Sequence, residues 1–184
     1  MKTAYIADNQ QTLFSRLFES ERQFTAAAAV PEACARVRPV EGSWSVLEVV
    51  EHIVLSDRGM LEAYRDAGEN THPVDRDAER CIATVGRDLS NRRQAPPQVH
   101  PTERFASPAE ALQRYRSTRA EIVHLIESSD EDFRTKRVLH PVMEMDSYQL
   151  FLLIAAHPER HTRQIEALKG STRYRTVNRQ RTAS

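Results

Sequence analysis

Apolar residues recur at every third or fourth position in four long segments of the chain, and this spacing places them along one face of an α-helix. The segments cover about residues 8–30, 45–66, 107–128 and 146–169. A fifth segment, at about 75–92, keeps the same spacing in spite of Gly86 and predicts an extra short helix. The polar stretch at 130–145, which contains His140 followed by Pro141, indicates a crossing loop. The pattern predicts an all-α fold.

Capping signals mark where two of these helices begin. Ser45 and Glu48 form a capping box, in which the serine accepts a hydrogen bond from the third helical amide and the glutamate reaches back. Ser107 and Glu110 repeat the pattern, with Pro108 at the first helical position, where its missing amide costs little. The register of both helices can therefore be assigned from the sequence.

Length and composition bound the organisation of the chain. Its 184 residues are enough for one domain with a substantial core, which we place at 1–170. Gly170 is a stop signal for the last helix. The remaining residues, 171–184, contain four arginines and no acid, and we expect a basic, disordered tail there.

Charge and cysteine content exclude several classes of function. Basic and acidic residues balance at 26 each, so no global charge favours nucleic acid or an anionic membrane as a partner. The longest apolar run, Leu150 to Ala156, is too short to span a bilayer, and the N-terminus has no apolar signal core. Cys34 and Cys81 do not make a disulfide framework, and we interpret both as small core residues. These features favour a cytoplasmic protein.

Two histidines share the apolar face of the last predicted helix. His157 and His161 are four residues apart, a spacing that places two imidazoles roughly 5–6 Å apart on one helix face. On a helical wheel they lie in a stripe about 80° wide. The other members of this stripe are Leu150, Leu153, Gln164 and Leu168. The pair therefore faces the interior, where one metal ion could bridge both rings.

Pro158 lies between these two histidines. It removes an amide, so the Ile154 carbonyl loses its helical partner. We expect a kink or local bulge there, since the apolar stripe keeps its phase across the proline. The alternative is that the helix breaks at this point.

A third histidine, His52, lies on the second predicted helix. This helix is apolar on nearly every face, and His52 belongs to its one narrow polar or small-residue stripe. The stripe also contains Ser45, Glu48, Ser56, Gly59 and Ala63. A single buried histidine is usually a core residue with satisfied hydrogen bonds. Three that face inward from two helices favour a metal site, because buried imidazoles without partners lose hydrogen bonds worth roughly 1–3 kcal/mol each.

Three imidazole ligands would leave a coordination position free, as in catalytic rather than sealed structural metal centres. Imidazole suits zinc, nickel, copper and iron alike, so the sequence does not select the metal. Two familiar motifs are excluded. Glu159 points away from the ligand face and is not placed as the base of a His-Glu-x-x-His site. His124 lies off the apolar stripe, which argues against a di-iron carboxylate bundle.

Other polar residues are candidates for the surroundings of the site. Glu48 and Gln164 could orient a histidine ligand by hydrogen bonding. Arg119 and Tyr115 lie on the inner stripe of their helix and could line a pocket that binds an anionic substrate group. An equally acceptable interpretation is a buried arginine paired with Glu48 or another acid. The sequence assigns no catalytic acid or base.

These residues resemble a known family. The pattern Trp44-Ser45, then Glu51-His52, and later the run from His157 to Ile165, is similar to the DinB-like superfamily, in its DinB/YfiT-like branch of metal-dependent hydrolases. The resemblance covers roughly residues 8–170. It implies an up-down four-helix bundle with a long crossing connection.

The resemblance also implies a divalent metal, most often zinc or nickel and in some cases iron, held by three histidines. Carried over by position, these are His52, His157 and His161. Relatives include thiol-dependent S-transferases that use a low-molecular-weight thiol as co-substrate, and many members form homodimers. We therefore expect a small-molecule substrate, with no nucleic acid or membrane partner.

Three functions remain open from the sequence. The first is a metal-dependent enzyme, either a hydrolase or a thiol S-transferase. The second is a non-catalytic metal- or ligand-binding bundle for sensing or stress storage, in which a fourth protein ligand, Glu48 above all, would close the site. The third is a helical interaction domain without a metal.

Overall fold

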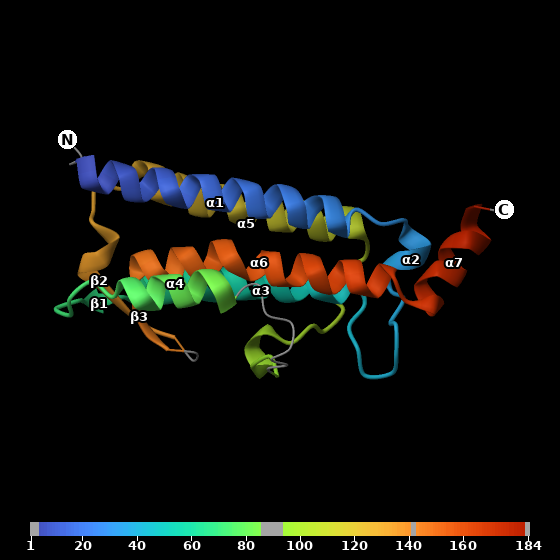
Figure 1. The fold of residues 1–184 in the computed structure, drawn as a ribbon. Coiled ribbons are helices and arrows are strands. Elements are labelled where there is room, and N and C mark those ends of the chain that lie inside the picture. Colours follow the sequence, from blue (N-terminus) through green and yellow to red (C-terminus); the bar gives the residue numbers. More distant parts are fainter. Residues whose placement is uncertain (1–3, 86–93, 141–142, 183–184) are drawn as a thin grey trace.

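The computed structural model describes residues 4–85, 94–140 and 143–182, and Figure 1 shows their arrangement. The helices are α1 (Ala4–Ala28), α2 (Glu32–Ala35), α3 (Val46–Arg65), α4 (Arg76–Val85), α5 (Pro108–Ser128), α6 (Ser147–Lys169) and α7 (Thr172–Thr182), with short 3-10 turns at Pro97–Val99 and Phe133–Thr135. Three short strands, β1 (Gly68–Glu69), β2 (Lys136–Leu139) and β3 (Glu144–Asp146), complete the fold. No helix in these ranges is long and apolar enough to cross a membrane.

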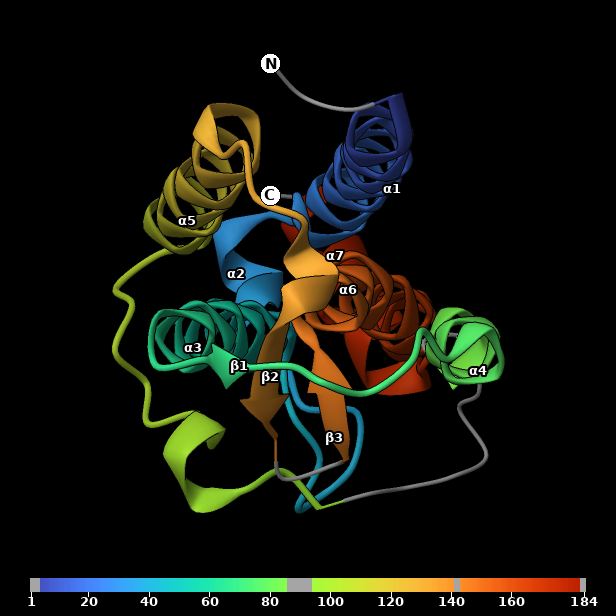
Figure 2. The same ribbon diagram turned by 90° about the vertical axis from the view of Figure 1, so that its left-hand side faces the viewer.

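Four long helices, α1, α3, α5 and α6, form the bundle that the sequence predicts. Seen from its end, α1 and α5 make one layer and α6 and α3 the other (Figure 2). Neighbouring pairs around the bundle are α1 with α6, α6 with α3, α3 with α5, and α5 with α1. The chain runs along the bundle in α1, back in α3, back again in α5 and forward in α6 (Figure 1). Because α3 and α5 are parallel, a long connection must return the chain between them.

That connection is the segment between α3 and α5, and it carries α4. This extra helix packs along the outer side of α6 (Figure 2). Ile82 is buried, and the side-chain amide of Gln149 donates to the Asp75 carbonyl at 3.1 Å. The predicted helix at 75–92 is confirmed up to Val85, and residues 86–93 lie outside the described residues. Cys81 is exposed on α4, so our interpretation of it as a core residue is wrong, whereas Cys34 is buried.

A small antiparallel sheet replaces the crossing loop that we expected at 130–145. The strand order is β1-β2-β3. Val138 pairs with Met145, and both side chains are buried in the core. This hairpin lies at one end of the bundle, where the chain passes from α5 to α6 (Figure 2). Its short alternation of apolar and polar residues is too brief to stand out from a loop in the sequence.

The basic tail is helical rather than disordered. Helix α7 spans Thr172–Thr182, and our prediction of a disordered tail is wrong for these residues. Tyr174 is buried, and α7 packs against the short helix α2. The Ser171 hydroxyl accepts from the Tyr174 amide at 3.3 Å and so caps the first turn. One buried aromatic ring outweighs the unfavourable charge pattern on which our prediction relied.

The apolar core consists of two clusters, one toward each end of the bundle. The cluster near the sheet includes Leu13, Met60 and Ile122, and the cluster near α2 and α7 includes Phe24, Val46 and Leu168. Buried polar residues lie between the clusters along three of the helices. These residues are Asp57 on α3, Thr118 and Arg119 on α5, and His161 on α6. The buried polar side chains that could form a functional site therefore lie in the middle of the bundle.

Candidate metal centre

The first ligand candidate is fixed by the start of α3. The predicted capping box is present, with the Ser45 hydroxyl accepting from the Glu48 amide and the Glu48 side chain accepting from the Ser45 amide. His52 follows two turns later and is 5% exposed. The box sets the register of α3, and the register turns His52 toward α6.

The second and third candidates lie on α6. This helix begins with a capping box between Asp146 and Gln149. It continues without interruption through Pro158 to Lys169, so the alternative that the helix breaks at the proline is wrong. His157 and His161 therefore stay one turn apart on the same face, and His161 is 5% exposed.

The three imidazole rings converge. The ring centroid of His52 lies 5.2 Å from that of His157 and 4.9 Å from that of His161, and the His157 and His161 centroids are 4.6 Å apart. The two Nε2 atoms on α6 are 3.0 Å apart. One nitrogen from each ring lies within 4.8 Å of the other two. The structure thus brings together the three residues that the sequence analysis selected.

Hydrogen bonds orient two of the rings. The Nδ1 atom of His52 donates to the Val99 carbonyl at 2.9 Å, and the Nδ1 atom of His161 donates to the Gln164 side-chain oxygen at 2.8 Å. A carbonyl oxygen only accepts, so each Nδ1 carries its proton and each Nε2 keeps its lone pair. Gln164 thus has the orienting role expected for it. The His52 ring is oriented instead by a backbone carbonyl, that of Val99.

Burial keeps the rings neutral. Desolvation lowers the pKa of His161 to about 3 and lowers the pKa of His52. Desolvation, reinforced by the neighbouring His161 and His52, lowers the pKa of His157 well below its ordinary value. Neutral imidazole is the form that binds metals, so the ligand atoms are available at neutral pH without competition from protons. The Nδ1 atom of His157 is buried and has no hydrogen-bond partner among the described residues.

Glu48 is not brought to the rings. Its carboxylate accepts from the Nε and Nη2 atoms of Arg38 at 2.9 and 2.6 Å, and from the Ser45 hydroxyl at 2.8 Å. Burial alone would raise the pKa of Glu48, but the hydrogen bonds from Arg38 and Ser45 hold it below its ordinary value. The proposed roles of Glu48, as an orienting partner or a fourth ligand, therefore have no support in the geometry.

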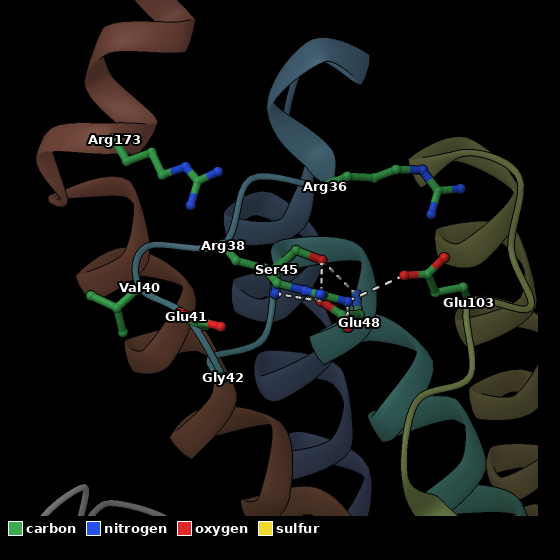
Figure 3. A pocket seen from close by; sticks show the side chains of 9 residues that line it. All are labelled: Arg36, Arg38, Val40, Glu41, Gly42, Ser45, Glu48, Glu103 and Arg173. Carbon is green, nitrogen blue, oxygen red and sulfur yellow. Dashed lines mark hydrogen bonds and ion pairs between the residues drawn. The ribbon is translucent and has the colours of Figure 1, made fainter.

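The arginine that holds Glu48 lines a separate pocket at the start of α3. Figure 3 shows this pocket, with a volume of about 440 Å³, and the bonds that join Arg38 to Glu48 and Glu103 within it. Its lining residues are Arg36, Arg38, Val40, Glu41, Gly42, Ser45, Glu48, Glu103 and Arg173. No histidine of the cluster lines it, so it does not give access to the three rings.

Arg119 and Tyr115 lie inside the bundle and not on a pocket wall. Both are 0% exposed, and the guanidinium lies 5.2 Å from the Tyr115 ring centroid. The Arg119 Nε atom lies 2.9 Å from the Asp57 Oδ2 atom. The interpretation of a buried arginine paired with an acid is therefore confirmed, and the acid is Asp57. The alternative, a group that binds an anionic substrate, has no support.

Three residues at the site received no role from the sequence, although Trp44 and Glu51 belong to the motif that carries the family resemblance. Val99 supplies the carbonyl that holds His52, and Trp44 packs its ring 4.9 Å from the ring of His52. Trp44 also contacts the exposed His100, at 5.6 Å between ring centroids. Glu51 anchors the segment that carries Val99, as described below. The run Glu51-His52 was a signal for Glu51, but nothing in the sequence connects Val99 to α3.

Fold and site together define a four-helix bundle with a buried cluster of three histidines. Residues 17–165 match the sequence profile of the DinB superfamily, and the chain belongs to this family. The structure is similar to that of YfiT from Bacillus subtilis, with 15% sequence identity, a TM-score of 0.56, and coverage of 88% of this chain and 86% of that one. YfiT is described as a probable metal-dependent hydrolase with an unusual four-helix bundle topology. No curated protein matches the chain at a significant level.

Proposed function

We propose that this protein is a metal-dependent enzyme whose divalent ion is held by His52, His157 and His161. The observation that carries the proposal is the convergence of three imidazole nitrogens within 4.8 Å of one another inside the bundle. A shared ion would give the lone pairs of these crowded nitrogens a common partner, which buried polar atoms require.

The donor set fits a first-row divalent metal. Neutral imidazoles suit zinc, nickel and iron, and we propose zinc or nickel as the resident ion. Hydrogen bonds from His52 to Val99 and from His161 to Gln164 hold the rings with Nε2 available. Such second contacts orient the ligands and tune the ion. A bound ion of this kind lowers the pKa of a coordinated water and so supplies a nucleophile at neutral pH.

An open coordination position favours catalysis over storage. Within the part of the chain that the structure describes, no carboxylate or thiolate joins the three histidines. Glu48, which could have closed the site, is bound by Arg38 and Ser45. The non-catalytic alternative, a sensor or storage bundle, would need a fourth protein ligand, and this arrangement offers none from the described acidic or cysteine residues.

For the reaction we propose hydrolysis of a small-molecule substrate. The support is the description of YfiT, whose fold this chain shares. Transfer to a low-molecular-weight thiol is the alternative reaction, in which the thiol would take the open position as a thiolate. The two reactions differ in one requirement, because only the transferase needs a thiol in the assay.

Metal analysis of protein purified without an affinity tag tests the proposal. We expect close to one equivalent of zinc or nickel in the wild-type protein and a large loss in His52→Ala and His161→Ala variants. The metal-loaded protein is then assayed on ester, amide and phosphoester substrates, with and without small thiols. Turnover without thiol supports a hydrolase, and turnover only with thiol supports a transferase. Metal well below one equivalent in the wild type, with no uptake on addition, contradicts the metal site.

A further inference from the structure

The segment whose Val99 carbonyl binds His52 is itself bound by Glu51, the residue that precedes His52 in the sequence. Glu51 is 1% exposed, and its carboxylate faces the connection between α4 and α5. Its Oε1 atom accepts from the Thr102 amide at 2.8 Å and from the Thr102 hydroxyl at 3.3 Å, and its Oε2 atom accepts from the Arg104 amide at 3.2 Å. Both carboxylate oxygens are therefore used to bind one short piece of backbone.

The backbone between these two amides has an unfavourable conformation. Glu103 has φ of 62°, in the left-handed region that residues with a side chain rarely adopt. This turn allows the amides of Thr102 and Arg104 to reach the same carboxylate. Such a conformation persists only when its surroundings enforce it, and the Glu51 carboxylate supplies the bonds that do so.

The same segment provides the partner of His52. The Val99 carbonyl, three residues before Thr102, accepts from the His52 Nδ1 atom at 2.9 Å. A 3-10 turn over Pro97–Val99, with the His100 amide donating to the Pro97 carbonyl at 3.2 Å, keeps this stretch compact. Two consecutive residues of α3 thus contact the segment: Glu51 accepts from its backbone amides, and His52 donates to its Val99 carbonyl.

We propose that Glu51 is a positioning residue for the three-histidine site. By fixing residues 102–104, it places the Val99 carbonyl where it holds the His52 ring in the Nδ1–H form and directs the Nε2 lone pair toward His157 and His161. Glu51 itself does not touch the metal position, since it does not belong to the group of converging side chains in the described part of the chain. The inference rests on the proposed function, because the ring orientation matters for binding an ion.

A Glu51→Gln variant tests the inference. Glutamine has nearly the same size, but its NH₂ group faces an amide donor, so either Thr102 or Arg104 loses its acceptor. We expect zinc affinity, measured by competition with a chromophoric chelator, to fall by about 10–100-fold, as is usual when a contact that orients a metal ligand is lost. Glu51→Asp keeps both oxygens on a shorter side chain, and we expect an intermediate loss.

Glu48→Gln is the matched control. Glu48 lies on the same helix, and its carboxylate accepts from Arg38 and Ser45 but not from the amides of Thr102 and Arg104. Arg38 also pairs with the exposed Glu103 side chain at 3.2 Å, so Glu48 reaches this segment through one exposed ion pair and not through its backbone. We expect this variant to lower thermal stability and to leave zinc affinity unchanged. A similar fall in affinity for Glu48→Gln and Glu51→Gln would mean that loss of stability alone explains the effect, and would overturn the proposal.

A second measurement separates this inference from the proposed function. In the chelator-treated protein, two-bond ¹H–¹⁵N spectra of the histidine rings report which nitrogen carries the proton. We expect His52 to be in the Nδ1–H form in the wild type and in a mixture of both forms in Glu51→Gln. If the wild type binds no zinc, the proposed function fails. The spectra of the metal-free protein still test whether Glu51 fixes the protonated nitrogen of His52. An unchanged His52 form in folded Glu51→Gln, or an unchanged zinc affinity, overturns it.

Discussion

The Arg119 Nη2 atom donates a hydrogen bond to the Ile154 carbonyl oxygen at 2.8 Å. Ile154 is the residue whose carbonyl loses its helical donor to Pro158, since proline has no amide. A side chain from α5 therefore replaces the missing bond, and α6 continues as a helix between its two histidines. The positive charge of the buried Arg119 guanidinium is balanced by the Asp57 carboxylate, whose Oδ2 atom lies 2.9 Å from the Arg119 Nε atom. Asp57, Arg119 and Pro158 thus act as one unit in shaping the site.

We expect Arg119→Met to destabilise the protein by about 3–5 kcal/mol, because it leaves the Asp57 carboxylate buried without its partner. The measurement is chemical denaturation of the metal-free protein. In a Pro158→Ala background, the Ile154 carbonyl regains a backbone donor, and Arg119→Met should cost about 1 kcal/mol less. Simple additivity of the two substitutions would show that the Arg119–Ile154 bond contributes nothing to α6.

Added metal should stabilise the folded protein. For a ligand that binds only the folded state, a concentration 100 times Kd contributes about 2.7 kcal/mol. For a domain of this length, that corresponds to a rise in Tm of roughly 5–10 °C. Differential scanning calorimetry of chelator-treated protein, with and without zinc, measures the shift. His161→Ala should abolish it, and an equal shift in that variant would place the ion elsewhere.

Acid should destabilise the metal-free protein through His161. Burial lowers the pKa of its ring to about 3, against 6.5 without burial, so below pH 6.5 the unfolded chain binds a proton that the folded chain does not. The stability that the neutral ring contributes is complete above pH 6.5 and is lost as the pH falls toward 3. Between pH 7 and pH 5 the loss is about 2 kcal/mol.

The effect of Asp57 on stability between pH 7 and pH 5 has the opposite sign. Burial raises its pKa to about 6, so the folded chain takes up this proton before the unfolded chain does, and stability rises as the pH falls through 6. The comparison of wild type with His161→Gln removes this contribution, because both proteins contain Asp57. We expect the stability lost between pH 7 and pH 5 to be about 2 kcal/mol smaller in His161→Gln. Parallel pH curves for the two proteins would contradict a neutral buried His161.

The two cysteines should differ sharply in reactivity. Cys81 is exposed, whereas Cys34 is buried with its sulfur 3.7 Å from the Asn178 Oδ1 atom on α7. In the native protein we expect the Cys81 thiol to react rapidly with a disulfide reagent and the Cys34 thiol to react slowly. Tyr174→Ala should destabilise the packing of α7 by about 3 kcal/mol and make Cys34 reactive. Arg175→Ala, on the exposed side of α7, is the control, and equal effects of the two variants would contradict the packing of α7 on α2.

The main helices and the three histidines could be predicted because their signals are local. Capping boxes fix helix starts within four residues, and the spacing of His157 and His161 on an apolar stripe turns both rings inward wherever the helix packs. The Ser107 hydroxyl accepts from the Glu110 amide as predicted, although the Glu110 carboxylate accepts from the Ala106 amide instead of completing the box. Such local rules need no knowledge of the neighbouring elements.

The surroundings of the site could not be predicted because they depend on contacts distant in sequence. The Val99 carbonyl is a backbone group, and any residue type at that position could supply it. The partner of Arg119 could have been any buried acid, and only the packing of α3 against α5 selects Asp57. Tyr174 in α7 is a single aromatic in an arginine-rich segment, so its burial depends on where α2 lies. These are tertiary effects that outweigh local composition.

His52 lies in the first third of the chain, and its two companion rings lie more than a hundred positions later, on α6. During synthesis on the ribosome, the growing polypeptide therefore carries just one of the three clustered histidines until His157 and His161 have emerged. The three-histidine cluster therefore cannot assemble on a polypeptide that lacks α6. We therefore expect the proposed ion to bind only after α6 has packed against α3, so that its uptake would follow assembly of the bundle.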